Sequence, residues 1–249
     1  PIIISIPFYF SIYNISFLNS YFESISGFTS TGFTIFENVK HLDESLIIWR
    51  SSSQWIGGLY FLFSIILLID IFDNSLKKSL TNFLTFNTSE TLKQSSKILI
   101  LYTLLTFLIF IFLNIFDFRF FDSFNLSMSL ISSGGFLPVN HLSTVLNTNA
   151  KEIIFALLML VSFFSIFLTY NLLFVSKKNI NFFQEDIYLF LYFIVLVFLF
   201  FLLFNSEYDF SVILLSLTSS ISNIGVSLDQ SPQNLSFFYL ILVIIGGSF

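Results

Sequence analysis

Four stretches of this chain are long, apolar and almost free of charged residues, and they limit its possible folds more than any other feature. They are residues 46–69, 98–115, 153–175 and 187–204. A helix rises about 1.5 Å per residue, so a run of roughly 20 apolar residues crosses the hydrocarbon of a bilayer. Only 10% of the 249 residues are charged, against roughly 25% in soluble domains. We therefore expect an all-α, multi-pass membrane protein.

Two shorter apolar runs stand at the ends of the sequence, residues 1–13 and 237–249. As helices they would reach only about 20 Å, which is less than the thickness of the hydrocarbon layer. We expect each of them to be part of a truncated span. With the four full-length stretches they would make six spans.

The basic residues are concentrated in two of the connections between the apolar runs, 70–97 and 176–186. These two connections hold six of the ten basic residues, namely Lys77, Lys78, Lys93, Lys97, Lys177 and Lys178. By the positive-inside rule both face the cytoplasm, which leaves 14–45, 116–152 and 205–236 outside. The alternative is that lysine counts in short loops carry no topological information.

The composition also excludes several functions. The net charge is −5 and the basic residues are scattered, so no basic stripe is present for a nucleic acid. The sequence has no cysteine and only two histidines, far apart, which leaves no disulfide, no thiolate nucleophile and no metal cluster. No paired acid and base or nucleophile arrangement suggests an enzyme. We expect no organic cofactor.

Each predicted outer connection opens with a short, apolar, serine-rich stretch of helical character and then breaks at a glycine. The short stretches are 21–28, 124–131 and 214–221, and the glycines are Gly32, Gly135 and Gly225. A serine stands six residues before each glycine, so the pattern repeats at intervals of roughly 90 to 100 residues. Repeats of this kind are common in membrane transport folds. The alternative is that serine and glycine only allow close helix packing.

Irregular backbone within a membrane suggests a cation filter. Unpaired carbonyl groups at this depth are tolerated only where they are buried in protein or line a wet cavity. There they can replace the hydration shell of a cation, and glycine lets the backbone take the required conformation. The carboxyl end of each half-helix adds partial negative charge.

Residues 21–34 (YFESISGFTSTGFT), followed by Trp49-Arg50 and by 54–58 (QWIGG), resemble the first pore loop and next helix of the Trk/Ktr/HKT superfamily of potassium transporters. Residues 132–136 (SSGGF) resemble its second filter, and 222–226 (SNIGV) its third. The last segment would also suit the fourth filter, so that register stays open.

The resemblance implies repeated units of span, re-entrant pore loop and span around one pseudo-fourfold ion pore. The first unit would be 1–71, the second 72–178 and the third 179–249, with the fourth absent. It also implies a homodimer in the cytoplasmic (inner) membrane, in contact with lipid and with a cytoplasmic nucleotide-binding regulatory subunit. The regulatory subunit would contact the basic stretch 70–97, although anionic lipid accounts for its charges equally well.

Carried over to this sequence, the selectivity filter comprises Ser30, Thr31, Gly32, Phe33, Thr34, Ser133, Gly134, Gly135, Phe136, Asn223, Ile224, Gly225 and Val226. The backbone carbonyls expected to bind K⁺ are those of Thr31, Gly32, Gly134, Gly135, Ile224 and Gly225. Arg50, Gln54 and Trp55 are expected to support the pore. For Arg50 a second interpretation is open, in which its side chain extends to the membrane interface.

The resemblance implies potassium uptake, as channel or as symporter. Family members selective for sodium carry a serine at the first filter glycine, so Gly32 favours potassium. Two alternatives remain: a sodium-permeable transporter of the same family, and a non-conducting membrane scaffold whose half-helices only pack.

Overall fold

The computed structural model describes residues 1–11, 13–72, 88–174, 183–204, 209–226, 228 and 242–243, and the regular elements in these ranges are helices. The α-helices are α1 (Ile2–Tyr9), α2 (Phe17–Phe28), α3 (Glu44–Phe72), α5 (Thr88–Ile115), α6 (Phe120–Ile131), α7 (Asn149–Phe174), α8 (Phe183–Phe204) and α9 (Phe210–Ile221). Two 3-10 turns, η1 (Val39–His41) and η2 (Leu142–Thr144), lie between a short helix and the next long one.

The four long helices coincide with the four predicted spans. Helices α3, α5, α7 and α8 have 29, 28, 26 and 22 residues. Within the described residues, one stretch, Ser95–Ile115, is both long and apolar enough to cross a membrane by itself, while Phe210–Ile221 forms a shorter apolar helix. The prediction of an all-α chain is confirmed.

The three short helices begin earlier than the sequence suggests. Each has 12 residues, and each starts four residues before the predicted position, at Phe17, Phe120 and Phe210. Each extra turn begins with phenylalanine and contains a serine, a mixture that suits a loop entering the membrane as much as a helix. In α2 the turn is fixed by Ser16, whose hydroxyl accepts a hydrogen bond from the Asn19 amide at 3.3 Å.

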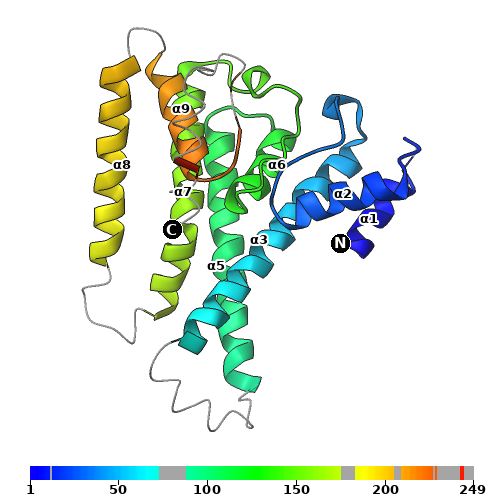
Figure 1. Cartoon of the computed structure of the whole chain (residues 1–249), viewed down its shortest axis with the longest axis horizontal. Helices are drawn as coiled ribbons and strands as arrows, with labels where there is room; N and C mark the ends of the chain where they lie inside the picture. The colour runs from blue at the N-terminus through cyan, green and yellow to red at the C-terminus, as the bar shows by residue number, and fades with distance from the viewer. Residues whose placement is uncertain are drawn as a thin grey trace.

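Two of the short helices, α6 and α9, lie between long ones, and α2 packs on α3 beside α1 (Figure 1). Helix α3 packs against both α2 and α6, and α7 packs against both α6 and α9. Helix α5 packs against α6 and α7, and α8 packs on α9. The loops that follow α2, α6 and α9 are thereby brought to neighbouring positions.

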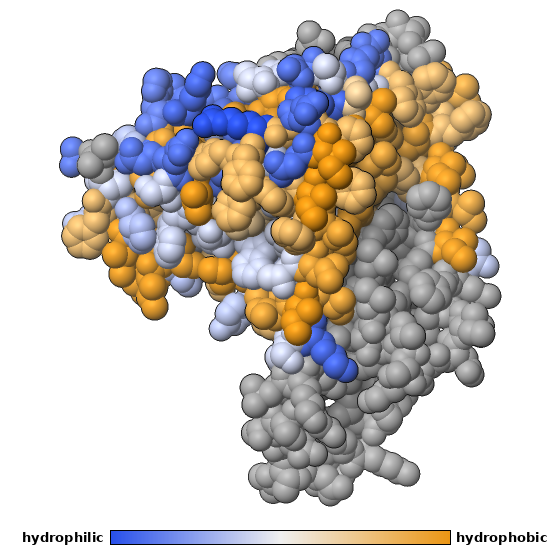
Figure 2. All heavy atoms as spheres, turned by 180° about the vertical axis from the view of Figure 1, so that it is seen from behind, coloured by the Kyte–Doolittle hydropathy of each residue, from blue (hydrophilic) through white to orange (hydrophobic). Residues whose placement is uncertain are grey.

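The surface fits a membrane environment. The most hydrophilic side chains gather along the upper part of the molecule in Figure 2, while hydrophobic side chains cover much of the described surface beneath. On α5, Ile100 and Phe107 are more than half exposed. Contiguous exposed apolar surface of this kind is rare on soluble monomers and is expected where lipid replaces water.

Some expectations fall on residues that are not described. Most of 70–97 and of 176–186, including Lys77, Lys78, Lys177 and Lys178, lies outside the described residues, as does most of the predicted truncated span 237–249. The orientation drawn from the lysines therefore stays a prediction.

Candidate functional site

The three short helices end in the same backbone turn. Two residues beyond each helix the chain takes a positive φ, and two residues further it does so again at the glycine. The first set is Ser30 (52°), Ser133 (51°) and Asn223 (55°). The second set is Gly32 (81°), Gly135 (72°) and Gly225 (70°). Since most side chains disfavour this conformation, its recurrence shows that the sequence repeat is also a structural one.

The turn is a Schellman motif, in which an amide beyond the helix end bonds back to a carbonyl in its last turn. The three bonds run from Thr31 to Ser26 (2.9 Å), from Gly134 to Ser129 (2.8 Å) and from Ile224 to Ser219 (3.2 Å). The acceptors are the serines that stand six residues before each glycine. The spacing noticed in the sequence therefore marks the carbonyl that closes the turn.

In two loops the same serine also fixes the residue after the glycine. The Ser26 hydroxyl donates to the Phe33 carbonyl at 2.5 Å, and the Ser219 hydroxyl donates to the Val226 carbonyl at 2.5 Å. These two predicted filter residues therefore direct their carbonyl groups toward a short helix of their own loop. The serine hydroxyls set where the loop bends after the glycine.

The glycines bring the loops into direct contact. A Cβ on Gly32 would lie 2.6 Å from the Gly134 carbonyl oxygen, and a Cβ on Gly135 would lie 2.5 Å from the Ile224 carbonyl oxygen. Both distances are too short for any side chain. A Cβ on Gly225 would meet no described atom within 4 Å. The first loop therefore contacts the second, and the second contacts the third. In both contacts the glycine of one loop faces the carbonyl of the residue that precedes the glycine of the next loop.

The first loop is held by a buried ion pair. Arg50 Nε donates to Glu23 Oε1 at 2.8 Å, and the two side chains are 2% and 0% exposed. Thr34 lies between them, because its hydroxyl donates to Glu23 at 2.9 Å and accepts from Arg50 Nη2 at 3.0 Å. Glu23 also accepts from the Ile35 amide at 2.9 Å. Arg50 therefore faces the protein interior rather than a membrane interface.

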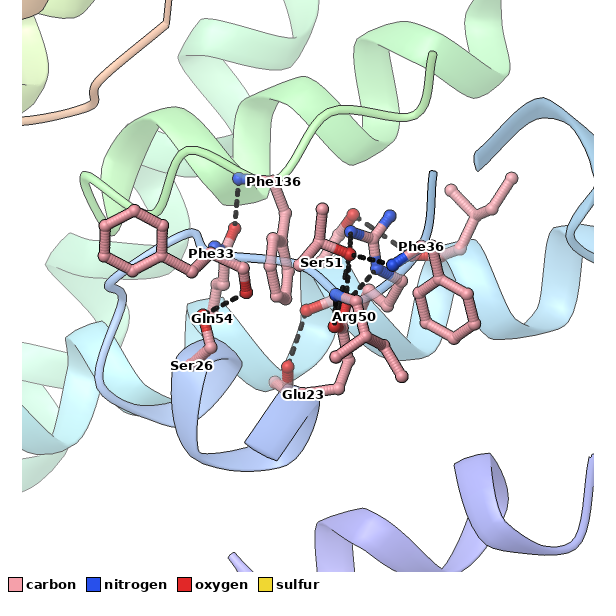
Figure 3. A network of polar contacts seen from close by, with 12 residues as sticks. Glu23, Ser26, Phe33, Phe36, Arg50, Ser51, Gln54 and Phe136 are labelled. Carbon is pink, nitrogen blue, oxygen red and sulfur yellow. Dashed lines mark hydrogen bonds and ion pairs between the residues drawn. The ribbon is translucent and has the colours of Figure 1, made fainter. Parts of the chain in front are cut away.

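The second loop is held by a neutral side chain of the same helix. Gln54 Nε2 donates to the Gly134 carbonyl, and its Oε1 accepts from the Phe136 amide at 3.2 Å. Figure 3 shows Arg50 and Gln54 reaching from one helix toward the two loops. Because a carbonyl oxygen has two lone pairs, the Gly134 oxygen retains one for a ligand.

Trp55 contacts the next long helix rather than a loop. Its indole N–H donates to Thr106 of α5 at 3.0 Å, and its ring packs against Tyr102 at 5.2 Å between centroids. It joins two long helices, and its support of a pore stays a prediction.

Sequence reasoning missed other parts of the site. The Phe136 ring is buried under Arg50, with the guanidinium carbon 4.3 Å from the ring centroid. Gly57 allows α3 to touch the Phe28 carbonyl, and a Cβ on Gly58 would lie 2.7 Å from Ser132 Cβ. Two adjacent glycines inside a long helix were the available signal for this close approach.

The chain is 33% identical over 181 residues, 68% of its length, to an uncharacterized cation transporter of Methanocaldococcus jannaschii. Over 55 residues it is 38% identical to the Trk system potassium uptake protein TrkI of Halomonas elongata. That match covers 22% of this chain and 11% of the relative. No protein-family profile matches the chain.

The fold resembles the crystal structure of the potassium transporter TrkH from Vibrio parahaemolyticus, with a TM-score of 0.69 and 18% identity. The match covers 94% of this chain and 50% of TrkH. The fold is thus that of an all-helical membrane transporter, and these relatives are transporters, not enzymes. The chain is a homologue of the Trk-type cation transporters. It spans about a third of the first relative's length, 36%.

Proposed function

We propose that the protein takes up potassium ions across the cytoplasmic membrane, through a filter built from the loops around Gly32, Gly135 and Gly225. The observation that carries the proposal is the repeated turn: three loops reach one place with the same positive-φ glycine, and each packs against the next. A turn used only for packing would not need to recur with equivalent backbone angles in three sequences that share few side chains.

Backbone oxygens are the ligands available for the ion. The Glu23 carboxylate is already paired with Arg50, so it adds no free negative charge beside the loops. The carbonyls of Thr31, Gly32, Gly134, Gly135, Ile224 and Gly225 are the proposed ligands. The three short helices also direct their carboxyl ends toward these loops, where the helix dipole favours a cation.

Selectivity for potassium over sodium is supported by the surroundings of Gly32. A serine at this position would place its Cβ 2.6 Å from the Gly134 carbonyl oxygen and would keep the strained φ of 81°. The second loop would have to move, and its carbonyl with it. Gly32 thus favours the geometry that the three loops share in this chain.

The relatives' names extend the proposal to the whole protein. Two of them are named as Trk system potassium uptake proteins, so we propose a multi-pass protein of the inner membrane, made of span, loop and span units with boundaries near residues 71 and 178. A homodimer and a cytoplasmic nucleotide-binding regulatory subunit complete the proposed assembly.

The test is ion flux through the whole protein reconstituted in liposomes. We expect K⁺ and Rb⁺ to enter and Na⁺ to enter more slowly. Gly135→Val, which would push a side chain into the Ile224 carbonyl, should abolish this flux. The matched control is Ala150→Val, which introduces the same side chain at an exposed position of α7.

The flux measurements distinguish the proposed function from its two alternatives. Flux of Na⁺ equal to that of K⁺ would favour the sodium-permeable transporter. Absence of any cation flux from the unaltered protein would favour the non-conducting scaffold. Unchanged flux in Gly135→Val would reject the filter assignment.

A further inference from the structure

One face of α3 touches two loops. Arg50, Gln54 and the pair Gly57-Gly58 are four and then three or four residues apart, which is the spacing of neighbours on one helical face. Arg50 bonds to Glu23 and Thr34 around the first loop, and Gln54 bonds to the second. Gly57 meets the end of α2 and Gly58 meets the end of α6. Both loops therefore rest on the same rigid element.

Phe136 links the two sets of contacts. Its amide is held by Gln54, while its ring lies 4.3 Å from the Arg50 guanidinium carbon and is 2% exposed. The far edge of the ring lies 3.3 Å from the position of a Cβ on Gly27 in α2. A side chain of the second loop is thus inserted between α3 and the short helix of the first loop.

Gly135 lies between the two atoms that Gln54 holds, the Gly134 oxygen and the Phe136 nitrogen. Because the ring is packed against Arg50 on one side and Gly27 on the other, a displacement of the ring is expected to shift the Phe136 backbone and with it the peptide units around Gly135. Arg50 fixes that ring by a cation–π contact from a desolvated site, where such contacts are strongest. The position of Arg50 is itself fixed by Glu23, which is fully buried.

We infer that the Glu23–Arg50 pair is a selectivity-determining positioning device that couples the first loop to the second through the Phe136 ring. The inference rests on the proposed function. Arg50 does not touch the ion. It orients the peptides around Gly135, and Glu23 keeps Arg50 in place. Substitutions in the pair are therefore expected to change the ratio of K⁺ to Na⁺ flux, in addition to any change in stability.

The experiment measures the ratio of K⁺ to Na⁺ flux for the whole protein in liposomes. Arg50→Met removes the cation above the ring, and Phe136→Leu removes the ring but leaves the ion pair. Each is expected to lower the ratio about 10-fold, which corresponds to about 1.4 kcal/mol. The double variant is expected to be no worse than the worse single one, because both changes break one link.

Arg50→Met leaves the Glu23 carboxylate buried and unpaired, which can prevent folding. Glu23→Gln/Arg50→Met removes both charges, so it should recover folding while the flux ratio stays low. A merely structural pair would instead recover both properties in this variant.

The matched control is Arg119→Met. Arg119 also pairs with a glutamate at the start of α3, Glu44, at 3.3 Å, and also lies over a phenylalanine, Phe121, at 5.6 Å. Both partners of that pair are 68% exposed, so the flux ratio should not change.

A folded, conducting Arg50→Met variant with the unaltered ratio would overturn the inference and leave the proposed function standing. Independent effects, in which the two single changes multiply, would also overturn it. A protein that conducts no cation before any substitution would reject the inference together with the proposed function.

Discussion

The first and third loops share a backbone turn but differ in what holds it. Nine residues before the glycine, the first loop has Glu23 and the third has Ser216. Glu23 belongs to a buried network with Arg50 and Thr34. Ser216 is buried in α9, and its hydroxyl has no hydrogen-bond partner among the described residues. The turn is set by the serine and glycine pattern, whereas its support differs from loop to loop.

The largest expected difference concerns stability at this pair of positions. Glu23→Gln leaves the Arg50 charge buried without its partner, a loss of about 3–5 kcal/mol in the free energy of unfolding. Ser216→Ala removes an unsatisfied buried hydroxyl and should be neutral or stabilising by up to about 1 kcal/mol. The retained folded fraction after heating in detergent, followed by size exclusion, measures both. Equal losses would mean that the third loop has a polar support of its own.

The next comparison concerns the glycines. Gly32→Ala and Gly225→Ala both place a side chain at positive φ, which costs about 1–2 kcal/mol. Only at Gly32 does the added methyl also meet a carbonyl, that of Gly134 at 2.6 Å. K⁺ flux should fall much further in Gly32→Ala than in Gly225→Ala. The reverse order would show that the space beside Gly225 is occupied in the whole protein.

A third test concerns the serine hydroxyl bond that the first and third loops share. Ser26→Ala and Ser219→Ala each remove one hydroxyl bond to the carbonyl after the glycine. A bond of this kind contributes about 1 kcal/mol to stability, so thermal unfolding should change by the same small amount in both variants. Unequal changes would mean that the hydroxyl bond contributes differently to stability in the two loops.

The smallest effect is expected at the helix ends. Ser30 and Asn223 both have positive φ, 52° and 55°, but asparagine tolerates this conformation better than serine. Ser30→Gly should therefore stabilise by about 1 kcal/mol, and Asn223→Gly by only about 0.3 kcal/mol. Denaturant midpoints in the same detergent would compare them. Destabilisation of both would show that the side chains matter more than the strain.

The sequence predicted the parts of the fold that depend on local pattern. The long helices follow from the length and polarity of their runs, and the positions of Gly32, Gly135 and Gly225 follow from the repeat. The starts of α2, α6 and α9 were four residues off, because aromatic residues at a membrane surface suit a loop and a helix alike.

The contacts between loops could not be predicted, since they join residues far apart in the chain. Gln54 bonds to a loop 80 residues later, and nothing near it in sequence indicates which carbonyl it meets. Trp55 stands beside it yet binds Thr106 of α5 instead. In the sequence Phe136 is simply the residue that follows a filter glycine. The arginine over its ring is visible only in the fold.

Arg50 and Gln54, the two side chains of α3 that hold the loops, acquire their partners at different times during synthesis. Glu23 precedes Arg50 by 27 residues, so the charged side chain finds its partner already made when α3 is inserted. Gln54 must wait for Gly134, and at about 5–20 residues per second this takes on the order of 4 to 16 seconds. The charged side chain therefore has its partner before the neutral one does, which is the less costly order because an unpaired charge costs more to bury than an unpaired amide.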